Sequence, residues 1–385
     1  MAASRSMAQL SSGEGFRPHL RQPSAATSSH KGRRNTLWRR LRFALTSQSR
    51  SEGPAMPATL APVRPIEIAE IRAAVARIKG TAIRTPLVKL ELGAGFPDIR
   101  LKLENLQPIN AYKLRGAANA VALLSDEERK LGVWTISAGN AGQGVAFAAR
   151  KAGAPCTVVA IETAPKAKLE RMRALGAKLV LVSYEEAWNA LDDRAYPGVE
   201  GTFVHPFDDD AFIAGHATMG LEILEDCPEA AAVICGVGGG GLITGVASAV
   251  KAEKPAIKVW AAEPDTAAPF ARSLEMGSPQ KYPEWQASFV DGAGGQSVFP
   301  RMWERMQPLV DGSIVVTLDQ TRRALRLMAE KARIIAEGAG CLPLAAALTG
   351  QIQQKGAGDG PIVCVVSGGN IDMTTFCDIL RETAE

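Results

Sequence analysis

The chain has 385 residues, of which 46% are hydrophobic and 22% charged, and its formal net charge at pH 7 is +4. This length allows a large buried core and exceeds one typical domain. Beyond residue 55 no basic and aromatic side chains cluster, which argues against a nucleic-acid surface. No apolar run approaches the ~18 residues that are needed to span a bilayer.

The first 55 residues are rich in Ser, Arg and Gly, show no sustained helical period, and contain only Glu14 and Glu52 as acidic residues. We favour a disordered tail, or an upstream misassigned start with translation beginning at Met56. A transit peptide has the same basic, acid-poor composition and stays an alternative, as does a basic interaction arm. We therefore leave residues 1–55 out of the fold. We expect a cytoplasmic protein, with organellar targeting by this segment as the alternative.

Six cysteines are scattered along the rest of the chain, and several lie in apolar runs such as Val233-Ile234-Cys235. None of them has CxxC or Cys/His ligand spacing. Thiols in such surroundings are typically buried and reduced. We expect free cysteines rather than disulfides.

Regular secondary structure is predicted from Pro65 onward. Residues 66–75 place apolar side chains on one side of a helix that follows the proline, and residues 100–104 alternate like a strand. From residue 131 strands and helices alternate. We expect strands at 133–137, 156–161, 178–182, 232–235, 259–262 and 362–366, and helices at 143–151 and 165–175. For the second of these helices, Thr163 is available as a cap and Gly176 is a stop signal.

Alternating strands and helices with continuously apolar strands are typical of parallel sheets covered on both faces. The predicted fold class is therefore α/β, and the chain is long enough for two such lobes. Parallel sheets bind ligands beyond the carboxyl ends of their strands. We accordingly expect the chemistry of this protein in the loops that follow the strands.

One of these loops is a run of glycines. Gly238, Gly239, Gly240 and Gly241 follow the strand predicted at 232–235, and a helix is expected to begin near Leu242. Glycines let backbone amides approach a phosphate closely, and a helix N-terminus contributes about half a positive charge. We interpret the run as a phosphate cradle, with a merely tight strand-to-helix turn as the alternative.

The same stretch matches the dinucleotide fingerprint GxGxxG through Gly236, Gly238 and Gly241, with Glu263 near the end of the next strand. A match of this kind is weak on its own, and four consecutive glycines exceed what a pyrophosphate turn needs. Binding of NAD stays open as an alternative.

Lys113 lies in a predicted loop after Pro108, close to a helix start. A lone lysine in such a place is usually a solvated charge, but Ala111, Tyr112 and Leu114 around it are apolar or aromatic. A desolvated ammonium has a lowered pKa, which leaves a free amine for imine formation and proton abstraction. We expect Lys113 to be the reactive nitrogen. Tyr112 is placed to pack near an aromatic ring, with a core tyrosine as the alternative.

Two further loops carry polar groups at strand ends. The first consists of Ser137, Ala138, Gly139, Asn140 and Ala141. Its amides and the Ser137 hydroxyl suit a carboxylate, and the Asn140 amide can hydrogen-bond a phenolic oxygen, although a capping loop is an alternative. Ser367 ends the last strand and can hydrogen-bond a pyridine nitrogen. Together with the lysine and the glycine run, these groups supply what pyridoxal phosphate requires.

His205 and His216 flank three consecutive aspartates, Asp208 to Asp210. Carboxylates beside histidines invite a metal interpretation. Consecutive aspartates on a loop are more often a solvated turn, and we expect no metal site there.

In this order the segments resemble the threonine and serine dehydratase family, fold-type II pyridoxal phosphate enzymes that also include serine racemases. The resemblance covers roughly residues 60–385. It rests on 107–116, 137–140, 205–209, 220–225, 238–242, 263–264 and 367–370.

The resemblance implies a role for each matching position. Lys113 matches the Schiff-base lysine, and Asn140 and Ser367 match the partners of the phenolic oxygen and of the pyridine nitrogen. Gly238 to Leu242 match the phosphate loop, and Ser137 with the following amides matches the substrate-carboxylate loop. The family fold, which is like that of the tryptophan synthase β subunit, implies a large cofactor-binding lobe of residues 56–134 and 208–385. Residues 135–207 would form a small lobe.

The chain also departs from the family pattern. It has Asn110-Ala111-Tyr112-Lys113 where Gly-Ser-Phe-Lys is usual, and Ala141 stands where a histidine is frequent. The smaller Ala141 makes room for a β-substituent bulkier than that of threonine, such as the aryl group of phenylserine. Ala138 replaces the second serine of racemases, so racemisation is disfavoured. Pro269 falls where a metal-binding carboxylate would be expected, and no regulatory domain is expected after Asn370.

We therefore predict a pyridoxal-phosphate-dependent lyase that eliminates the β-hydroxyl of an amino acid such as threonine, serine or phenylserine, releasing ammonium. β-Replacement of the cysteine synthase type and an NAD-dependent oxidoreductase are the alternatives. The expected partner is a small amino-acid substrate, without nucleic acid or membrane. The family implies a homodimer or homotetramer.

Overall fold

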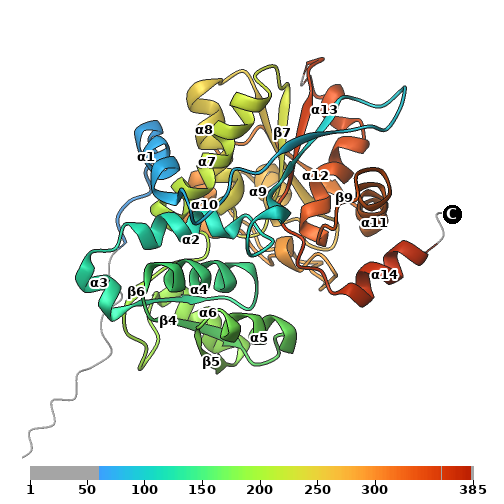
Figure 1. The fold of residues 1–385 in the computed structure, drawn as a ribbon. Helices are drawn as coiled ribbons and strands as arrows, with labels where there is room; N and C mark the ends of the chain where they lie inside the picture. The colour runs from blue at the N-terminus through green and yellow to red at the C-terminus, as the bar shows by residue number, and fades with distance from the viewer. Residues whose placement is uncertain (1–59, 357, 383–385) are drawn as a thin grey trace, which may run out of the picture. The chain divides into compact units, whose positions relative to one another are not determined.

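The computed structural model describes residues 60–356 and 358–382, so the interpretations of residues 1–55 lie outside the described residues. Two sheets carry the architecture (Figure 1). The first has the strand order β1-β2-β10-β7-β8-β9, and the second has the order β5-β4-β3-β6. The strands are β1 (Leu87–Leu90), β2 (Ile99–Leu103), β3 (Val133–Ile136), β4 (Cys156–Ile161), β5 (Lys178–Val182), β6 (Thr202–Phe203), β7 (Ala232–Gly236), β8 (Lys258–Pro264), β9 (Gly312–Val316) and β10 (Ile362–Val366).

The α-helices alternate with these strands over much of the chain. They are α1 (Ile68–Ile78), α2 (Lys113–Ala122), α3 (Asp126–Leu131), α4 (Asn140–Ala152), α5 (Lys166–Ala174), α6 (Tyr184–Asp193), α7 (Asp210–Asp226), α8 (Gly241–Glu253), α9 (Pro269–Met276), α10 (Pro300–Met306), α11 (Leu318–Leu327), α12 (Gly338–Leu348), α13 (Gln351–Gln354) and α14 (Met373–Arg381). Short 3₁₀ segments lie at η1 (Glu104–Leu106) and η2 (Asp291–Ala293), and a π-helical segment lies at η3 (Met328–Ala332).

The predicted α/β class with parallel sheets is confirmed. The strands of both sheets pair in parallel, except that β1 pairs with β2 in antiparallel orientation at the edge of the larger sheet. The strands expected at 156–161, 178–182 and 362–366 have these bounds in the structure. β1, β6 and β9 were not predicted, because they are short strands at sheet edges with partly exposed side chains.

Three local predictions about helix starts are wrong. The helix expected at 143–151 is α4, which begins three residues earlier, at Asn140. The first helix begins at Ile68 rather than at residue 66, because Glu67 forms a capping box with Glu70. Thr163 does not cap α5, whose N-cap is Pro165 without any side-chain hydrogen bond. The stop signal is confirmed, since Gly176 follows α5 with a φ of 93° that favours glycine.

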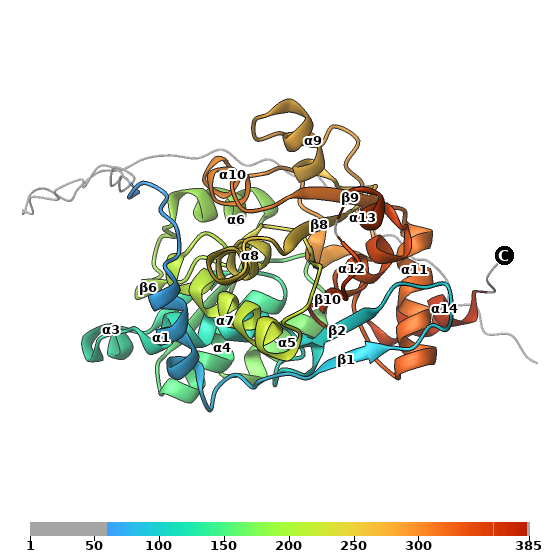
Figure 2. The same ribbon diagram turned by 90° about the horizontal axis from the view of Figure 1, so that it is seen from above.

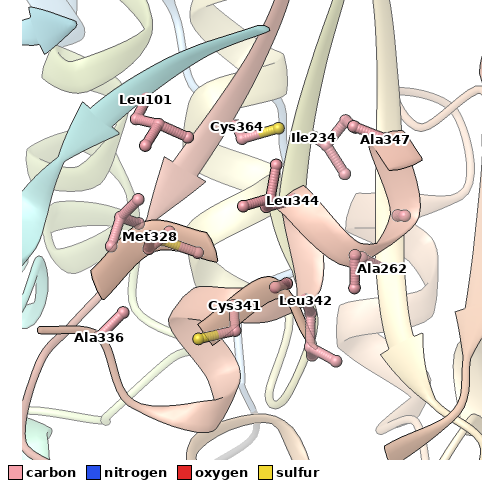
Figure 3. Close-up of a cluster of buried hydrophobic side chains, with 14 of the residues drawn as sticks. Leu101, Ile234, Ala262, Met328, Ala336, Cys341, Leu342, Leu344, Ala347 and Cys364 are labelled. Carbon is pink, nitrogen blue, oxygen red and sulfur yellow. The ribbon is translucent and has the colours of Figure 1, made fainter. Parts of the chain in front are cut away.

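Helices cover both faces of the six-stranded sheet. Alternate strand residues face α11 and α12 on one side, where Leu101, Ile234, Ala262 and Cys364 meet Leu344 in a buried cluster (Figure 3). The intervening residues, among them those of β7, β8 and β10, face the apolar sides of α7, α8 and α10. Figure 2 shows α7 and α8 beside each other on this side of the sheet. Burial on both faces explains why these strands read as continuous apolar runs.

The four-stranded sheet is covered in the same way, with α4 and α5 on one face and α6 on the other (Figure 1). In β3, Val133 belongs to the α4 side, whereas Trp134 and Ile136 belong to the α6 side. This alternation follows from the two-residue period of a strand. The carboxyl ends of β3 and β7 lead directly into the loops before α4 and α8.

Other sequence-level expectations can be checked in the described residues. All six cysteines are free and five are buried, which confirms the prediction of free thiols. Within residues 60–356 and 358–382, no helix is both long and apolar enough to cross a membrane.

Candidate functional site

A cavity of about 550 Å³ lies where the loops with Lys113, Asn140, Gly239 and Ser367 meet. Most of the predicted site residues line it: Tyr112, Lys113, Ser137, Ala138, Gly139, Asn140, Ala141, Gly239 and Ser367. The predicted residues Gly238, Gly240, Gly241 and Leu242 do not line it but flank Gly239 in the chain. Loops at the carboxyl ends of β3, β7 and β10 thus converge on one space, as expected for parallel sheets.

Lys113 is the first residue of α2 and extends into this cavity. Its Nζ donates a hydrogen bond of 2.5 Å to the carbonyl oxygen of Pro206 and lies 5.2 Å from the centre of the Tyr112 ring. In the described part of the chain Lys113 forms no ion pair with a carboxylate. Desolvation therefore lowers the pKa of the Lys113 ammonium from 10.5 to about 7. Near pH 7 the Lys113 amine is therefore neutral in a substantial share of the molecules.

The segment before Lys113 is held against the loop after β10. The Tyr112 amide donates to the Ser367 carbonyl oxygen at 2.9 Å, and the Gly369 amide donates to the Asn110 carbonyl oxygen at 2.9 Å. Asn110 adopts a φ of 57°, a left-handed conformation that asparagine tolerates better than most residues. These contacts fix the distance between the lysine and the serine, which are 254 positions apart in the sequence (367 − 113).

The Asn140 side chain is oriented by two partners. Its Nδ2 donates to Glu337 Oε1 at 2.8 Å, and its Oδ1 accepts a hydrogen bond of 2.8 Å from Asn370 Nδ2. Asn370 Nδ2 also donates to the Ile109 carbonyl oxygen at 2.9 Å. An amide nitrogen has two hydrogens, so one hydrogen of Asn140 Nδ2 remains available to the cavity.

Glu337 is a cavity residue that the sequence analysis missed. It is buried at the N-cap of α12, and its pKa is raised to about 7 by desolvation and by the negative charge of Asp291. A Cβ at Gly368 would lie 2.4 Å from Glu337 Oε1, so a larger residue after Ser367 would displace this carboxylate. A glutamate directly before the small residues Gly338-Ala339-Gly340 was the only signal in the sequence.

The loop after β3 offers donors to a carboxylate. Ser137 Oγ accepts a hydrogen bond of 3.1 Å from the Gly139 amide, and α4 begins at Asn140 without a side-chain cap. The first amides of a helix have no partner within it, so those of Asn140 and Ala141 are available to a ligand. A Cβ built on Gly139 would meet no atom within 4 Å, which shows how open the loop is.

The glycine run fits a phosphate group. Gly240 is the N-cap of α8, with a φ of 87° and no side-chain cap, so the first amides of α8 are not used by a capping side chain. The run also lies very close to the rest of the protein. A Cβ on Gly239 would lie 2.4 Å from the Phe207 ring, and one on Gly238 would lie 2.8 Å from the Gly292 carbonyl oxygen. A larger side chain at either position would collide with these neighbours, so the close packing of this loop depends on glycine.

The residues of the cavity therefore fit the cofactor that the sequence predicts. A desolvated amine, Gly239 and the Ser367 side chain line one space, and Gly239 leads directly into the uncapped N-terminus of α8. An aldehyde, a phosphate and a pyridine nitrogen require groups of these kinds. The Tyr112 ring faces the same space and packs against His216, with ring centres 4.7 Å apart. Tyr112 thus lines the cavity and also packs against a buried residue, and its contact with a cofactor stays a prediction.

The aspartates between the two histidines do not form the solvated turn that we expected. Asp208 is buried and accepts hydrogen bonds from Arg301 and Arg305, and it pairs with Arg194. These guanidinium groups hold the pKa of Asp208 below its usual value, against the opposing effect of desolvation. Asp209 caps α7 by accepting from the Phe212 amide. The expectation failed because Arg301 and Arg305 come from a segment far along the chain. Within the described ranges, no group of three or more His, Cys, Asp or Glu side chains is arranged to hold a metal ion.

Glu263, the acidic residue of the dinucleotide interpretation, is also engaged. Its carboxylate accepts hydrogen bonds from the Phe270 and Ala271 amides at 2.8 Å and from Ser313 Oγ at 2.6 Å. It caps the N-terminal end of α9 and is buried. A ribose hydroxyl has no access to it.

Comparisons with known proteins match the chain over most of its length. Residues 78–368 match the family model described as "Pyridoxal-phosphate dependent enzyme". The chain is 36% identical over 328 residues to a catabolic L-threonine dehydratase of Staphylococcus aureus, covering 84% of this chain and 94% of the relative. It is 37% identical over 323 residues to an L-threonine ammonia-lyase of Thermotoga maritima, covering 82% and 79%. The solved structure of maize serine racemase superposes with a TM-score of 0.76 at 33% identity, covering 82% and 97%.

Proposed function

The chain belongs to the family of pyridoxal-phosphate dependent enzymes, and from this premise we propose that it is an ammonia-lyase acting on a β-hydroxy-α-amino acid. The reaction would remove the β-hydroxyl of a substrate such as threonine, serine or phenylserine and give a 2-oxo acid and ammonium. The Staphylococcus aureus and Thermotoga maritima relatives, which carry threonine dehydratase and ammonia-lyase names, support this reaction class.

The membership confirms the resemblance, the fold type II architecture and the cofactor that the sequence analysis predicted. It also weighs against the NAD-dependent alternative, for which Glu263 is not accessible. Residues 56–134 with 208–385, and 135–207, stay our proposal for the two lobes. A homodimer or homotetramer and a cytoplasmic location likewise stay predictions.

One observation carries the proposal: Lys113 presents a desolvated amine without a carboxylate partner, among the described residues, inside a cavity that also holds uncapped helix amides. Bound pyridoxal phosphate supplies an aldehyde that joins covalently to an amine and withdraws electrons from the substrate Cα. The first amides of α8 and the glycines before it would hold the phosphate, Ser367 the pyridine nitrogen and Asn140 the phenolic oxygen.

The protein's own groups then account for the remaining steps. Ser137 and the amides at the start of α4 would hold the substrate carboxylate and so orient the Cα–H bond. The neutral Lys113 amine would remove the Cα proton. Its pKa of about 7 is close to physiological pH, which suits a general base. The β-hydroxyl leaves as water after it receives a proton. Hydrolysis of the released enamine consumes one water and yields the 2-oxo acid and ammonium.

A neutral hydroxyl at Ser367 suits this reaction. A carboxylate opposite the pyridine nitrogen would keep the ring protonated and strengthen its electron withdrawal. Ser367 is buried and carries no charge, so the ring is left less electron-withdrawing, which favours elimination over extended carbanion chemistry.

The test is an ammonia-release screen of wild type and Lys113→Ala with threonine, serine and phenylserine. We expect ammonium and a 2-oxo acid from at least one of them, and at least about a thousandfold loss in the variant. Absence of ammonium with every substrate would contradict the proposal. Incorporation of an added thiol instead of ammonium release would favour the β-replacement alternative.

A further inference from the structure

One wall of the cavity is apolar and comes mainly from α6. The residues of α6 that line the cavity are Tyr184, Ala187, Trp188 and Leu191. Their spacing of i, i+3, i+4 and i+7 places them on one face of the helix. A capping box between Ser183 and Glu186 fixes where this helix starts. We call these four residues the α6 wall.

The strand residues packed against α6 continue this apolar surface. Ile136, Val159 and Ile161 from β3 and β4 line the cavity, and they also belong to or pack on the hydrophobic cluster beneath α6. Ala187 has the smallest side chain of the α6 wall and is buried in this cluster. The cavity is therefore lined on this side by residues of the apolar layer between the helix and the sheet.

The aromatic side chains of the wall are held in place by one another. The Trp188 ring stacks on Tyr184 at 5.8 Å with an interplanar angle of 13°, and it lies 5.5 Å from the Phe299 ring. Phe299 lies 5.1 Å from Phe207, which also lines the cavity. Such a set of rings prefers an aromatic ligand over a small aliphatic or a charged one.

Charge is concentrated at the other end of the cavity. Lys168, Asp291 and Glu337 line it there, and they also line a neighbouring cavity of about 840 Å³ to which α6 contributes nothing among the described residues. Lys168 pairs with Asp291. The four residues of the α6 wall and the strand residues Ile136, Val159 and Ile161 include no charged side chain. A charged β-substituent would lose its hydration on this side without gaining a partner.

The position of the reacting groups sets the direction of the substrate side chain. Ile136 directly precedes Ser137, so the apolar surface begins next to the loop that offers donors to the carboxylate. The amine must lie toward Lys113. With these two ends assigned, the α6 wall is the apolar surface left for the third substituent of Cα.

We infer that the α6 wall is the side-chain subsite and that it selects β-hydroxy amino acids with an aromatic β-substituent over threonine and serine. The inference rests on the proposed function, because that function assigns the carboxylate and amine ends. Ala141, which is buried beside the same space, contributes room rather than contact. One additional buried methylene typically gives about 10- to 200-fold discrimination, so a whole ring should give at least about tenfold.

Binding of amino acids that cannot lose a β-hydroxyl tests the subsite separately from the reaction. Calorimetric titration of the holoenzyme with L-phenylalanine and L-alanine should show at least about tenfold tighter binding of L-phenylalanine. Equal affinities, or tighter binding of L-alanine, would overturn the inference. Failure to release ammonium from phenylserine while L-phenylalanine still binds tightly would instead contradict the proposed reaction and leave the subsite supported.

Two variants locate the preference on the helix. Ala187→Leu enlarges the smallest side chain of the wall and Trp188→Ala removes its largest ring, and each should lower the ratio of the two affinities at least about fivefold. Ala174→Leu adds the same volume at an exposed position of the neighbouring helix α5 and should leave the ratio unchanged. A ratio that survives both wall variants would place the preference elsewhere. If a variant does not bind the cofactor, the wild-type ratio and the other variant still decide.

Discussion

Asn140 Nδ2 donates a hydrogen bond of 2.8 Å to Glu337 Oε1, although the two residues lie 197 positions apart in the chain. The bond joins the start of α4, where a substrate carboxylate would bind, to the N-cap of α12. A buried carboxylate thereby orients an amide that faces the cofactor cavity. The protonation state of Glu337 therefore affects how the Asn140 amide is held.

Glu337→Gln should change how stability depends on pH. Burial raises the folded-state pKa of Glu337 from 4.5 to about 7. The favourable contribution of the protonated side chain to the free energy of unfolding is therefore fully present below pH 4.5, and it is lost as pH rises through about 7. The loss amounts to at most roughly 3 kcal/mol. Glutamine does not ionise, so we expect the variant to gain stability relative to wild type between pH 5 and pH 8.

Urea unfolding of the holoenzyme at these two pH values measures the effect. Glu127→Gln is the control, because Glu127 is exposed in the first turn of α3, and we expect it to leave the pH dependence as in wild type. A Glu337→Gln variant that follows the wild-type curve would show that Glu337 titrates with an ordinary pKa.

Gly139→Ala should weaken substrate binding without harming the fold. The added Cβ meets no protein atom within 4 Å, but it enters the loop proposed to hold the substrate carboxylate. We expect KM to rise at least about tenfold, the effect of an unfavourable binding term of about 1.4 kcal/mol. Thermal unfolding and cofactor absorbance should stay as in wild type, and an unchanged KM would move the carboxylate site away from this loop.

Arg115→Met should destabilise the protein severely. The fully buried Arg115 guanidinium pairs with Glu104 and Glu222, and Glu222 also pairs with Lys102. Removing one member leaves buried charge without a partner, which costs about 3–5 kcal/mol. Arg381→Met is the matched control, because Arg381 forms an exposed pair with Asp378. Such pairs contribute at most about 1 kcal/mol. Denaturant unfolding that gives similar losses for both variants would contradict the network's importance.

The rate of cofactor capture should reflect the unusual pKa of Lys113. Only a neutral amine attacks an aldehyde, and the pKa of this group is lowered from 10.5 to about 7 by desolvation. With cofactor-free enzyme and added pyridoxal phosphate, we expect the rate of the absorbance change to rise with pH up to about 7 and to level off above it. A rate that keeps rising toward pH 10 would indicate an ordinary, solvated lysine.

Parts of the fold could be read from the sequence because their strands form continuous apolar runs. β4, β5 and β10 are flanked by clear turn signals, and their bounds were predicted without error. β1 was missed because Lys89 interrupts its apolar residues, and β9 because Gly312 and Ser313 leave only three apolar residues in it. Local signals do not reveal which segments become edges.

The candidate site likewise contains residues that the sequence revealed and residues that it did not. The loops with Lys113, Gly239 and Ser367 were found because each carries its own local signature. Glu337 and the arginine partners of Asp208 were not found, because the residues that they contact lie far away in the sequence. Trp188 belongs to no motif in the sequence, and only the cavity revealed the surface that it lines.

The central claim is most directly tested by finding the atom to which the cofactor attaches. The holoenzyme is reduced with borohydride, digested with trypsin and analysed by mass spectrometry. We predict that the reduced cofactor is attached to Nζ of Lys113, and that the Lys113→Ala protein carries no such adduct. An adduct on a different lysine of the wild type, or none at all, would contradict the account.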